Sequence, residues 1–334
     1  DAVRFSLVLL TKEGQAVRLA PDRFEQGSRF CNKVWNAARF VMMNLAGEAS
    51  TEPSTRFEDR WILSSLARTR DSVTAALEEY RFNDAASEMY RFVWNDFCDW
   101  YVELSKHRLT GDDDASAMDA RATLTRVLTD TLGLLHPFTP YLTEKLWAAL
   151  HETLGRDPES MLCVAPWPTG DALSVDEGAE AEMAVLQDFV GCVRRVRALT
   201  MVPERKPVPV VVNATRADVR ETMERHRGAA ASLAFVESLE IAEAAERPAQ
   251  SAVAVAGGLE TFVVLGGDVD FAKLKTVLEG RAEKVGKALM GTEKKLQNEG
   301  FLKKADPELI EAEKARAKEL ALEKELLERN AAGL

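Results

Sequence analysis

Apolar residues recur at three- and four-residue spacing through most of the first 150 residues, and this spacing restricts the chain to helices that each bury one face. Helices are predicted at about 21–45, 59–80, 83–104, 118–135 and 140–150, with Asn83 or Asp84 capping the third. Long helices joined by short loops favour an antiparallel helical bundle.

After residue 155 the pattern changes. Gly155–Gly178 is rich in Pro and Gly, which predicts a linker. A helix follows that we expect to expose Arg194, Arg195 and Arg197. Short β-rich segments with one helix between the first two then predict a small α/β domain. The predicted strands are Val208–Val212, Leu233–Ile241, Ser251–Ala256 and Glu260–Leu265.

From residue 271 onward, leucines recur close to heptad spacing, which predicts two long helices paired as an antiparallel hairpin coiled coil. The expected packing positions are Leu274, Leu278, Val285, Leu289 and Leu296, then Leu309, Ala312, Leu320 and Leu327. The first helix is basic, because residues 271–304 hold nine Lys or Arg and four Glu. Ordinary solvated coiled-coil surface, with Lys–Glu pairing inside the hairpin, accounts for this charge equally well.

We therefore expect a mainly α chain in three parts. Residues 1–165 would form the helical bundle, 166–268 the linker and small α/β domain, and 269–334 a projecting coiled-coil arm.

The segment 29–45 carries two stripes when it is drawn as a helix. The stripe predicted to be buried contains Cys31, Val34, Trp35, Ala38, Val41, Met42 and Leu45. The opposite stripe contains Arg29, Lys33, Asn36 and Phe40, flanked by Asn32, Arg39 and Met43. An exposed ring among cations and amides suits unstacked RNA bases, because rings stack on bases and polar groups bond base edges and phosphates. From the pattern alone, a solvated face with one packed aromatic ring is the simpler interpretation.

Composition restricts the class of protein. With 46% hydrophobic and 29% charged residues the chain is globular, and no apolar run suits a membrane span or a signal peptide, so we expect a cytoplasmic protein. The scattered Cys31, Cys98, Cys163 and Cys192 suggest reduced thiols and no metal site. A net charge of −11 repels phosphate, so any nucleic-acid site needs locally concentrated basic residues. Because the chain begins at Asp1, we expect it to be a piece of a longer protein.

Catalytic and nucleotide-binding motifs are missing from the sequence. Gly280 and the pair Gly286-Lys287 have the wrong spacing for a phosphate-binding loop, and Ala288 replaces the required Ser or Thr. The histidines form no recognisable catalytic motif. The chain therefore has the character of a binding module.

Several segments resemble valyl-tRNA synthetases. Residues 30–41 (FCNKVWNAARFV) resemble the first helix of the family's anticodon-binding domain, and residues 59–64 (DRWILS) resemble the start of the next. Residues 136–147 (HPFTPYLTEKLW) are similar to a further signature of that domain. Residues 298–305 (NEGFLKKA) are similar to the turn of the family's C-terminal coiled-coil hairpin.

The resemblance implies a class Ia anticodon-binding domain followed by a tRNA-binding arm. The parent enzyme would activate valine with ATP and Mg²⁺ and esterify tRNA(Val), using a catalytic core and an editing domain upstream of this chain. This chain alone would hold no cofactor and catalyse nothing, and it would bind tRNA(Val) and its own catalytic domain as a monomer.

Site residues follow from the same resemblance. In the family, the helix that matches 29–44 reads anticodon bases, which implicates Lys33, Asn36, Arg39 and Phe40, with Arg29 and Asn32 as weaker additions. The family's arm leans on the outer corner of tRNA, which implicates Lys284, Lys287, Lys294 and Lys295. A stand-alone structural or adaptor protein, which uses the coiled coil to recruit another protein, is the alternative.

Overall fold

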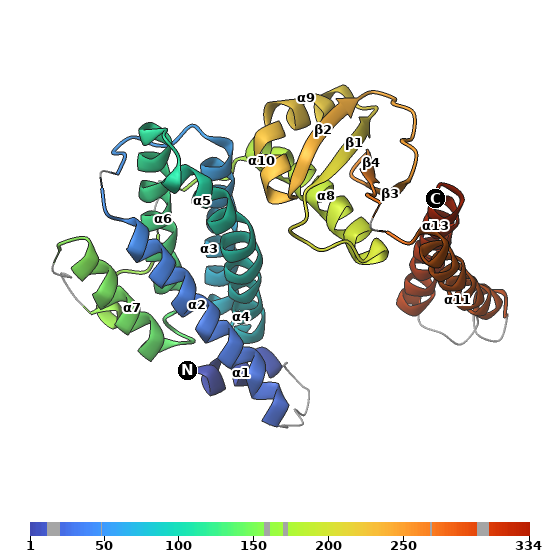
Figure 1. Cartoon of the computed structure of the whole chain (residues 1–334). Helices are drawn as coiled ribbons and strands as arrows, with labels where there is room; N and C mark the ends of the chain where they lie inside the picture. Colours follow the sequence, from blue (N-terminus) through green and yellow to red (C-terminus); the bar gives the residue numbers. More distant parts are fainter. Residues whose placement is uncertain (12–20, 48, 157–160, 170–172, 268, 299–306) are drawn as a thin grey trace. The chain divides into compact units, whose positions relative to one another are not determined.

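The computed structural model describes residues 1–11, 21–47, 49–156, 161–169, 173–267, 269–298 and 307–334 (Figure 1). The chain folds into two compact units, residues 1–183 and 184–334. Within the described ranges, no helix is both long and apolar enough to cross a membrane. The predicted mainly α fold is confirmed.

The first unit is helical throughout its described secondary structure. Its elements are α1 (Ala2–Leu10), η1 (Pro21–Phe24), α2 (Glu25–Asn44), α3 (Phe57–Glu78), α4 (Phe82–Arg91), η2 (Phe92–Tyr101), α5 (Val102–Thr110), α6 (Asp114–Leu135), α7 (Pro140–Thr153) and η3 (Leu162–Val164). The helix α6 packs against α2, α3 and α5, and both α2 and α3 pack against η2, so these helices form the bundle (Figure 1).

One predicted helix has a different local geometry. The segments α4, η2 and α5 follow without a break from Phe82 to Thr110, but η2 is π-helical. The predicted cap also differs, because Asn83 lies inside α4 and its amide donates to the carbonyl oxygen of Val8 in α1 at 3.2 Å. Asn83 therefore joins two helices and does not begin one.

The helix α1 packs on α2 at Gly27. A Cβ atom at this position would collide with the carbonyl oxygen of Ala2 and the hydroxyl of Ser6. This close approach places Phe5 against Phe30, and both side chains are fully buried. Because Gly27 has no Cβ atom, α1 can approach α2 closely enough for Phe5 to pack against Phe30.

A buried carboxylate joins four elements of the bundle. Asp59, at the start of α3, has no exposed surface. Its oxygens accept hydrogen bonds from Arg108 of α5 at 2.6 and 2.7 Å, from Tyr101 of η2 at 2.5 Å and from Ser54 at 2.6 Å. Arg108 also donates to the carbonyl oxygen of Ser116 in α6 at 3.1 Å. Each charge has a partner, as burial requires.

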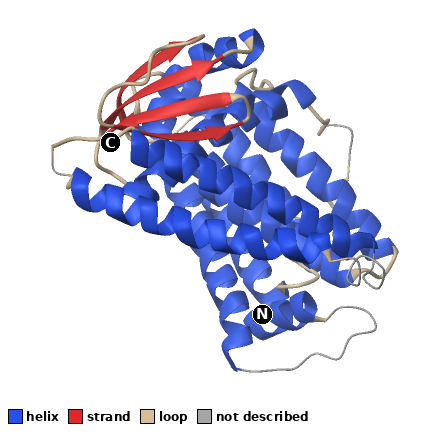
Figure 2. Ribbon diagram, turned by 90° about the vertical axis from the view of Figure 1, so that its right-hand side faces the viewer, coloured by secondary structure: helices blue, strands red, loops and turns tan. Residues whose placement is uncertain are grey.

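The second unit contains a four-stranded mixed sheet (Figure 2). Its elements, after α8 (Glu177–Thr200), which begins within the first unit, are β1 (Val208–Ala214), α9 (Ala217–Arg225), α10 (Arg227–Leu233), β2 (Val236–Ala242), β3 (Ser251–Ala256) and β4 (Leu259–Val264). The strand order is β2-β1-β4-β3, with β1 parallel to β2 and β4 antiparallel to both of its neighbours.

Two predictions for this unit were wrong for one reason. Arg197 was expected on the outer side of its helix, but it is 4% exposed. Its guanidinium donates to backbone carbonyl oxygens, which include those of Ala234 at 3.1 Å and Phe235 at 2.9 Å. These bonds fix a turn after α10, so β2 begins at Val236 and not at Leu233.

The arm consists of α11 (Phe271–Gln297) and α13 (Pro307–Ala332), which pack along each other. Its end contacts the sheet, because the Asn330 side chain donates to the carbonyl oxygen of Val253 at 2.9 Å and accepts from its N–H at 2.6 Å. Since β3 lies at the edge of the sheet, Asn330 satisfies backbone groups that an unpaired edge would leave free.

The predicted packing register of α13 was partly wrong. Leu309 is 46% exposed and Ala312 is exposed, whereas Glu313 is buried and Leu327 is buried as expected. Glu313 replaces an apolar residue because it forms an ion pair with Lys295 across the hairpin. The predicted turn at 298–305 lies, apart from Asn298, outside the described residues.

We expect Asp59→Asn to lower the free energy of unfolding of the first unit by about 3 kcal/mol, because the mostly buried Arg108 guanidinium would lose its bidentate partner and keep only the Glu58 carboxylate, 3.2 Å away. Urea denaturation measures this change. Asp84→Asn is the control, since Asp84 pairs with Arg81 at an exposed site. Equal losses of stability in the two variants would contradict the role given to Asp59.

Candidate functional site

The helix α2 presents one face to the bundle and the other to solvent. Its buried residues are Gly27, Phe30, Val34, Ala37, Ala38 and Val41. These positions recur at three- and four-residue spacing, as expected for a helix packed on one side. The opposite face is therefore fixed by the core and is available for a partner.

The residues predicted for the site lie on this outer side of α2. Arg29, Asn32, Asn36 and Arg39 are exposed. Lys33 and Phe40 are half-buried and lie along one edge of the exposed face. The structure thus brings all six onto one helix surface, as the sequence pattern predicted.

Trp35 does not belong to the core, although the sequence pattern placed it there. It is 42% exposed. The buried stripe is centred on Phe30, Val34 and Val41, which turns the position of Trp35 away from the bundle. Sequence reasoning counted the apolar residues but assigned the wrong centre to the stripe, because Phe30 was not included.

Lys33 is held by two residues of η2. Its ammonium donates to Asp99 Oδ1 at 2.8 Å and lies 5.2 Å from the centre of the Trp94 ring. Burial alone would lower the pKa of Lys33, but the hydrogen bond and the charge of Asp99 outweigh burial and raise this pKa above its ordinary value of 10.5. Lys33 is therefore charged at neutral pH and has a fixed partner.

The π-helical geometry explains why Trp94 and Asp99 act together. In a π-helix each turn closes between residues five positions apart, so such residues lie one above the other. Trp94 and Asp99 are five residues apart within η2. Nothing in the sequence period distinguishes this segment from an α-helix, so sequence reasoning missed both residues.

Trp94 is also the outer end of a series of stacked rings. The ring centres are 4.2 Å apart between Phe5 and Phe30, 5.3 Å between Phe30 and Tyr90, and 5.5 Å between Tyr90 and Trp94. The series begins at the fully buried Phe5 and reaches the half-buried Trp94 below Lys33. Packing from the core therefore fixes the ring on which Lys33 lies.

The two arginines on the outer face of α2 differ in whether they form an ion pair. Arg29 pairs with Glu25 at 2.8 Å, and both side chains are largely exposed. Arg39 has no ion pair or hydrogen bond within the part of the chain that the structure describes. The Arg39 guanidinium is thus available to an external acceptor, and the exposed amides of Asn32 and Asn36 lie on the same side.

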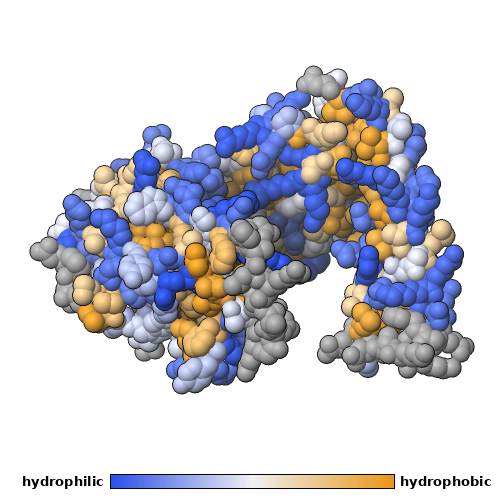
Figure 3. Space-filling view, turned by 90° about the horizontal axis from the view of Figure 1, so that it is seen from below, coloured by the Kyte–Doolittle hydropathy of each residue, from blue (hydrophilic) through white to orange (hydrophobic). Residues whose placement is uncertain are grey.

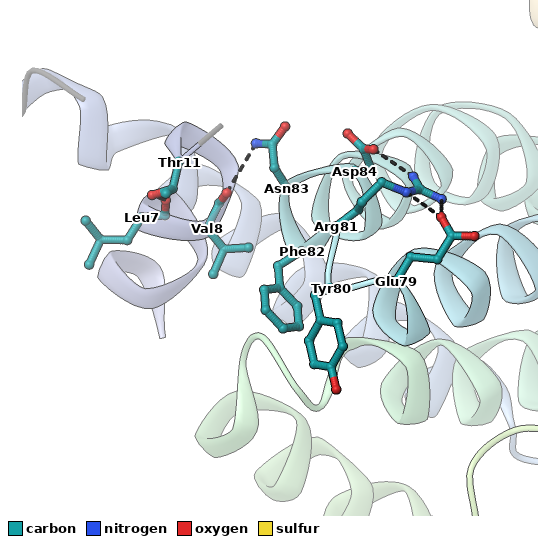
Figure 4. A pocket seen from close by; sticks show the side chains of 9 residues that line it. All are labelled: Leu7, Val8, Thr11, Glu79, Tyr80, Arg81, Phe82, Asn83 and Asp84. Atoms are coloured by element: carbon teal, nitrogen blue, oxygen red, sulfur yellow. Dashed lines mark hydrogen bonds and ion pairs between the residues drawn. The ribbon is translucent and has the colours of Figure 1, made fainter. Parts of the chain in front are cut away.

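A pocket of about 640 Å³ lies between the end of α1 and the turn from α3 to α4 (Figure 4). Tyr80 is 79% exposed with a φ of 60°, and its ring meets the Phe82 ring edge to face at 6.1 Å. Arg81 pairs with Glu79 and Asp84, so the described lining offers no unpaired cation to a phosphate. Sequence reasoning did not predict this pocket.

The four lysines predicted on the arm fall into two groups. Lys284 and Lys294 are exposed and have no partner among the described residues. Lys287 pairs with Glu283 at 2.7 Å, and Lys295 pairs with Glu313 of α13. On the face of the molecule that the space-filling view shows, hydrophilic residues predominate and hydrophobic ones are scattered between them (Figure 3). The two unpaired lysines are the ones that can contact an anion without breaking an existing pair.

Two family models match this chain. Residues 59–212 match the anticodon-binding domain of tRNA ligase, and residues 270–334 match the valyl tRNA synthetase tRNA binding arm. The first match begins after α2, so it does not include the outer face of that helix. The second covers the whole of α11 and α13.

Curated relatives named valine–tRNA ligase extend the similarity to nearly the whole chain. The Rhizobium meliloti protein is 40% identical over 98% of this chain and 34% of its own length. The Syntrophotalea carbinolica protein is 37% identical over 94% of this chain and 35% of its own length, and the Geobacillus stearothermophilus protein is 35% identical over 100% and 38%. The chain therefore spans about a third of the length of these relatives.

We expect Asp99→Asn to lower the pKa of Lys33, because burial would remain as the main cause of a shift. An NMR titration of lysines labelled at Cε measures this pKa. In the unchanged chain the pKa of Lys33 lies above its ordinary value of 10.5. The free energy that the Lys33–Asp99 ion pair contributes to folding is therefore fully present below pH 10.5 and is lost as pH rises through the raised pKa. An unchanged pKa in the variant would contradict the Lys33–Asp99 contact.

Proposed function

This chain carries an anticodon-binding domain of tRNA ligases and the tRNA-binding arm of valyl-tRNA synthetase, and from this premise we propose that it holds tRNA(Val) for aminoacylation. In the proposal, the outer face of α2 reads anticodon bases and α11 contacts another part of the tRNA. We place aminoacylation, with ATP and Mg²⁺, in a catalytic part of a longer enzyme, because the relatives are named valine–tRNA ligase and this chain spans 34% of the Rhizobium meliloti protein. The chain acts as a monomer in the cytoplasm.

The single observation that carries the proposal is the outer face of α2. It combines the Arg39 guanidinium, which has no partner in the described part of the chain, with the exposed amides of Asn32 and Asn36 and the half-buried ring of Phe40. Single-stranded RNA is recognised by stacking on rings and by hydrogen bonds to base edges, and this face supplies groups for both. Bases of an anticodon loop are unpaired and can meet such a face.

The arm supports a different kind of contact. Lys284 and Lys294 are point charges on one helix, without aromatic rings beside them in the described part of α11. Lysines of this kind contact phosphates and contribute affinity that depends on salt but not on base sequence. We assign sequence reading to α2 and general tRNA affinity to α11.

We expect Phe40→Ala to weaken binding of an anticodon hairpin of tRNA(Val) by about 1 to 3 kcal/mol, because one stacked base loses its ring. Fluorescence anisotropy measures the affinity, and the melting temperature checks that the variant folds. Tyr141→Ala, which removes a 79% exposed ring from α7 and leaves the outer face of α2 intact, is the control and should bind as the unchanged chain does. Unchanged affinity of Phe40→Ala would exclude the proposed base contact.

We expect the double variant Lys284→Gln, Lys294→Gln to weaken binding of full-length tRNA, and to lower the dependence of log K on log salt by roughly one unit per lost phosphate contact. Titrations at several KCl concentrations measure this slope. Lys314→Gln on α13 is the control, since Lys314 already pairs with Glu311 at 2.7 Å. A slope equal to that of the unchanged chain would exclude the proposed arm contact.

A further inference from the structure

The charge of Lys33 is already compensated before any ligand arrives. Its ammonium lies 2.8 Å from Asp99, and the two side chains remain 33% and 42% exposed. Both groups are therefore open to solvent at the edge of the α2 face. Arg39, on the same helix, has no such partner in the described residues.

This compensation is built into the fold. The π-helical turn places Trp94 and Asp99 on one side of η2, and the stacked rings that begin at Phe5 support Trp94 from below. At the end of η2, Tyr101 is anchored to the buried Asp59. The position of Asp99 is therefore set by two separate parts of the core.

A paired lysine discriminates between RNA groups in a way that a free lysine does not. A free ammonium attracts every phosphate, and phosphates carry no sequence information. Beside Asp99, a phosphate would meet a second negative charge, which disfavours its approach. A lysine ammonium has three donors, and the Asp99 contact uses one. The remaining donors can serve a neutral acceptor such as a base carbonyl or ring nitrogen.

We propose that Asp99 and Trp94 are specificity-determining positioning residues, which restrict Lys33 to the acceptor edge of an unpaired RNA base and keep it from binding phosphate. The inference rests on the proposed function, because it assumes that the α2 face meets the anticodon loop. It adds Trp94 and Asp99 of η2 to that site, and it gives Asp99 the role of excluding phosphate from Lys33.

The test compares two RNA hairpins on the full 334-residue chain, one with the anticodon loop of tRNA(Val) and one with the three anticodon bases replaced by their complements. We expect Asp99→Asn to reduce the ratio of the two affinities by about fivefold or more. The variant should bind the altered hairpin more tightly, and the salt slope should rise by roughly 0.7, the value for one added phosphate contact on a single strand.

Glu103→Gln is the matched control. Glu103 is exposed one turn after Asp99 and pairs with Lys106 at 2.6 Å. The charge of Glu103 also acts on Lys33 from a greater distance, so the control removes a nearby negative charge while the Lys33–Asp99 hydrogen bond stays intact. Loss of discrimination in both variants alike would overturn the proposal, because a general change of charge would then explain it.

Trp94 is tested by its conservative replacement. Trp94→Phe keeps a ring under the ammonium and should retain most of the discrimination, whereas Trp94→Leu should lose it although both variants fold, as their melting temperatures would show. If Trp94→Leu discriminates as the unchanged chain does, Trp94 has only a structural role and its part of the proposal fails.

Lys33→Gln separates this inference from the proposed function. If the unchanged chain and Lys33→Gln bind both hairpins equally, the anticodon assignment itself fails. If Lys33→Gln abolishes discrimination but Asp99→Asn preserves it, only the role of Asp99 fails. Asp99→Asn added to Lys33→Gln should have no further effect on the affinity ratio.

Discussion

The buried carboxylate of Asp59 is the interaction on which the geometry of the first unit depends. A charge without exposed surface is tolerated only when its hydrogen bonds are satisfied, and here the donors come from η2, from α5 and from the chain that precedes α3. The requirement works in both directions, because Arg108 needs the carboxylate as much as the carboxylate needs Arg108. The start of α3 is thereby held against the η2–α5 junction, whose donors lie 42 and 49 positions further along the chain.

The same interaction reaches the outer surface through η2. Tyr101, the last residue of the π-helical segment, is bonded to Asp59, while Trp94 and Asp99 of that segment contact Lys33 on α2. A π-helix is rare and occurs mostly as a single turn inside an α-helix, so a segment as long as η2 needs support from surrounding contacts. In this unit the buried anchor at one end and the stacked rings at the other supply those contacts. The site edge on α2 is thus determined by the core beneath it.

Sequence reasoning predicted the helices of the bundle and the outer stripe of α2, because apolar spacing reports directly on which face of a helix is buried. It failed where a polar side chain forms hydrogen bonds to the backbone of a distant element. Asn83 was taken as a cap but joins α4 to α1, and Arg197 was taken as exposed but binds carbonyl oxygens after α10. Trp35 was placed in the core because a one-position error in the centre of a stripe changes the face assigned to a bulky residue. The contacts of Lys33 with Trp94 and Asp99 could not be predicted, because they depend on the π-helical geometry of η2. The spacing of apolar residues in this segment is the same as in an α-helix.

Net charge explains why the pairing of individual cations matters in this protein. At −11 the chain repels polyanions at long range, so binding of an RNA depends on short-range contacts with specific cations. The exposed lysines Lys284 and Lys294, which have no partner among the described residues, attract phosphates of any sequence. A cation held beside a carboxylate gains little from a phosphate and can still donate to a neutral base edge. A surface that contains both kinds can therefore separate affinity from discrimination, with the free cations supplying the first and the Lys33–Asp99 pair the second.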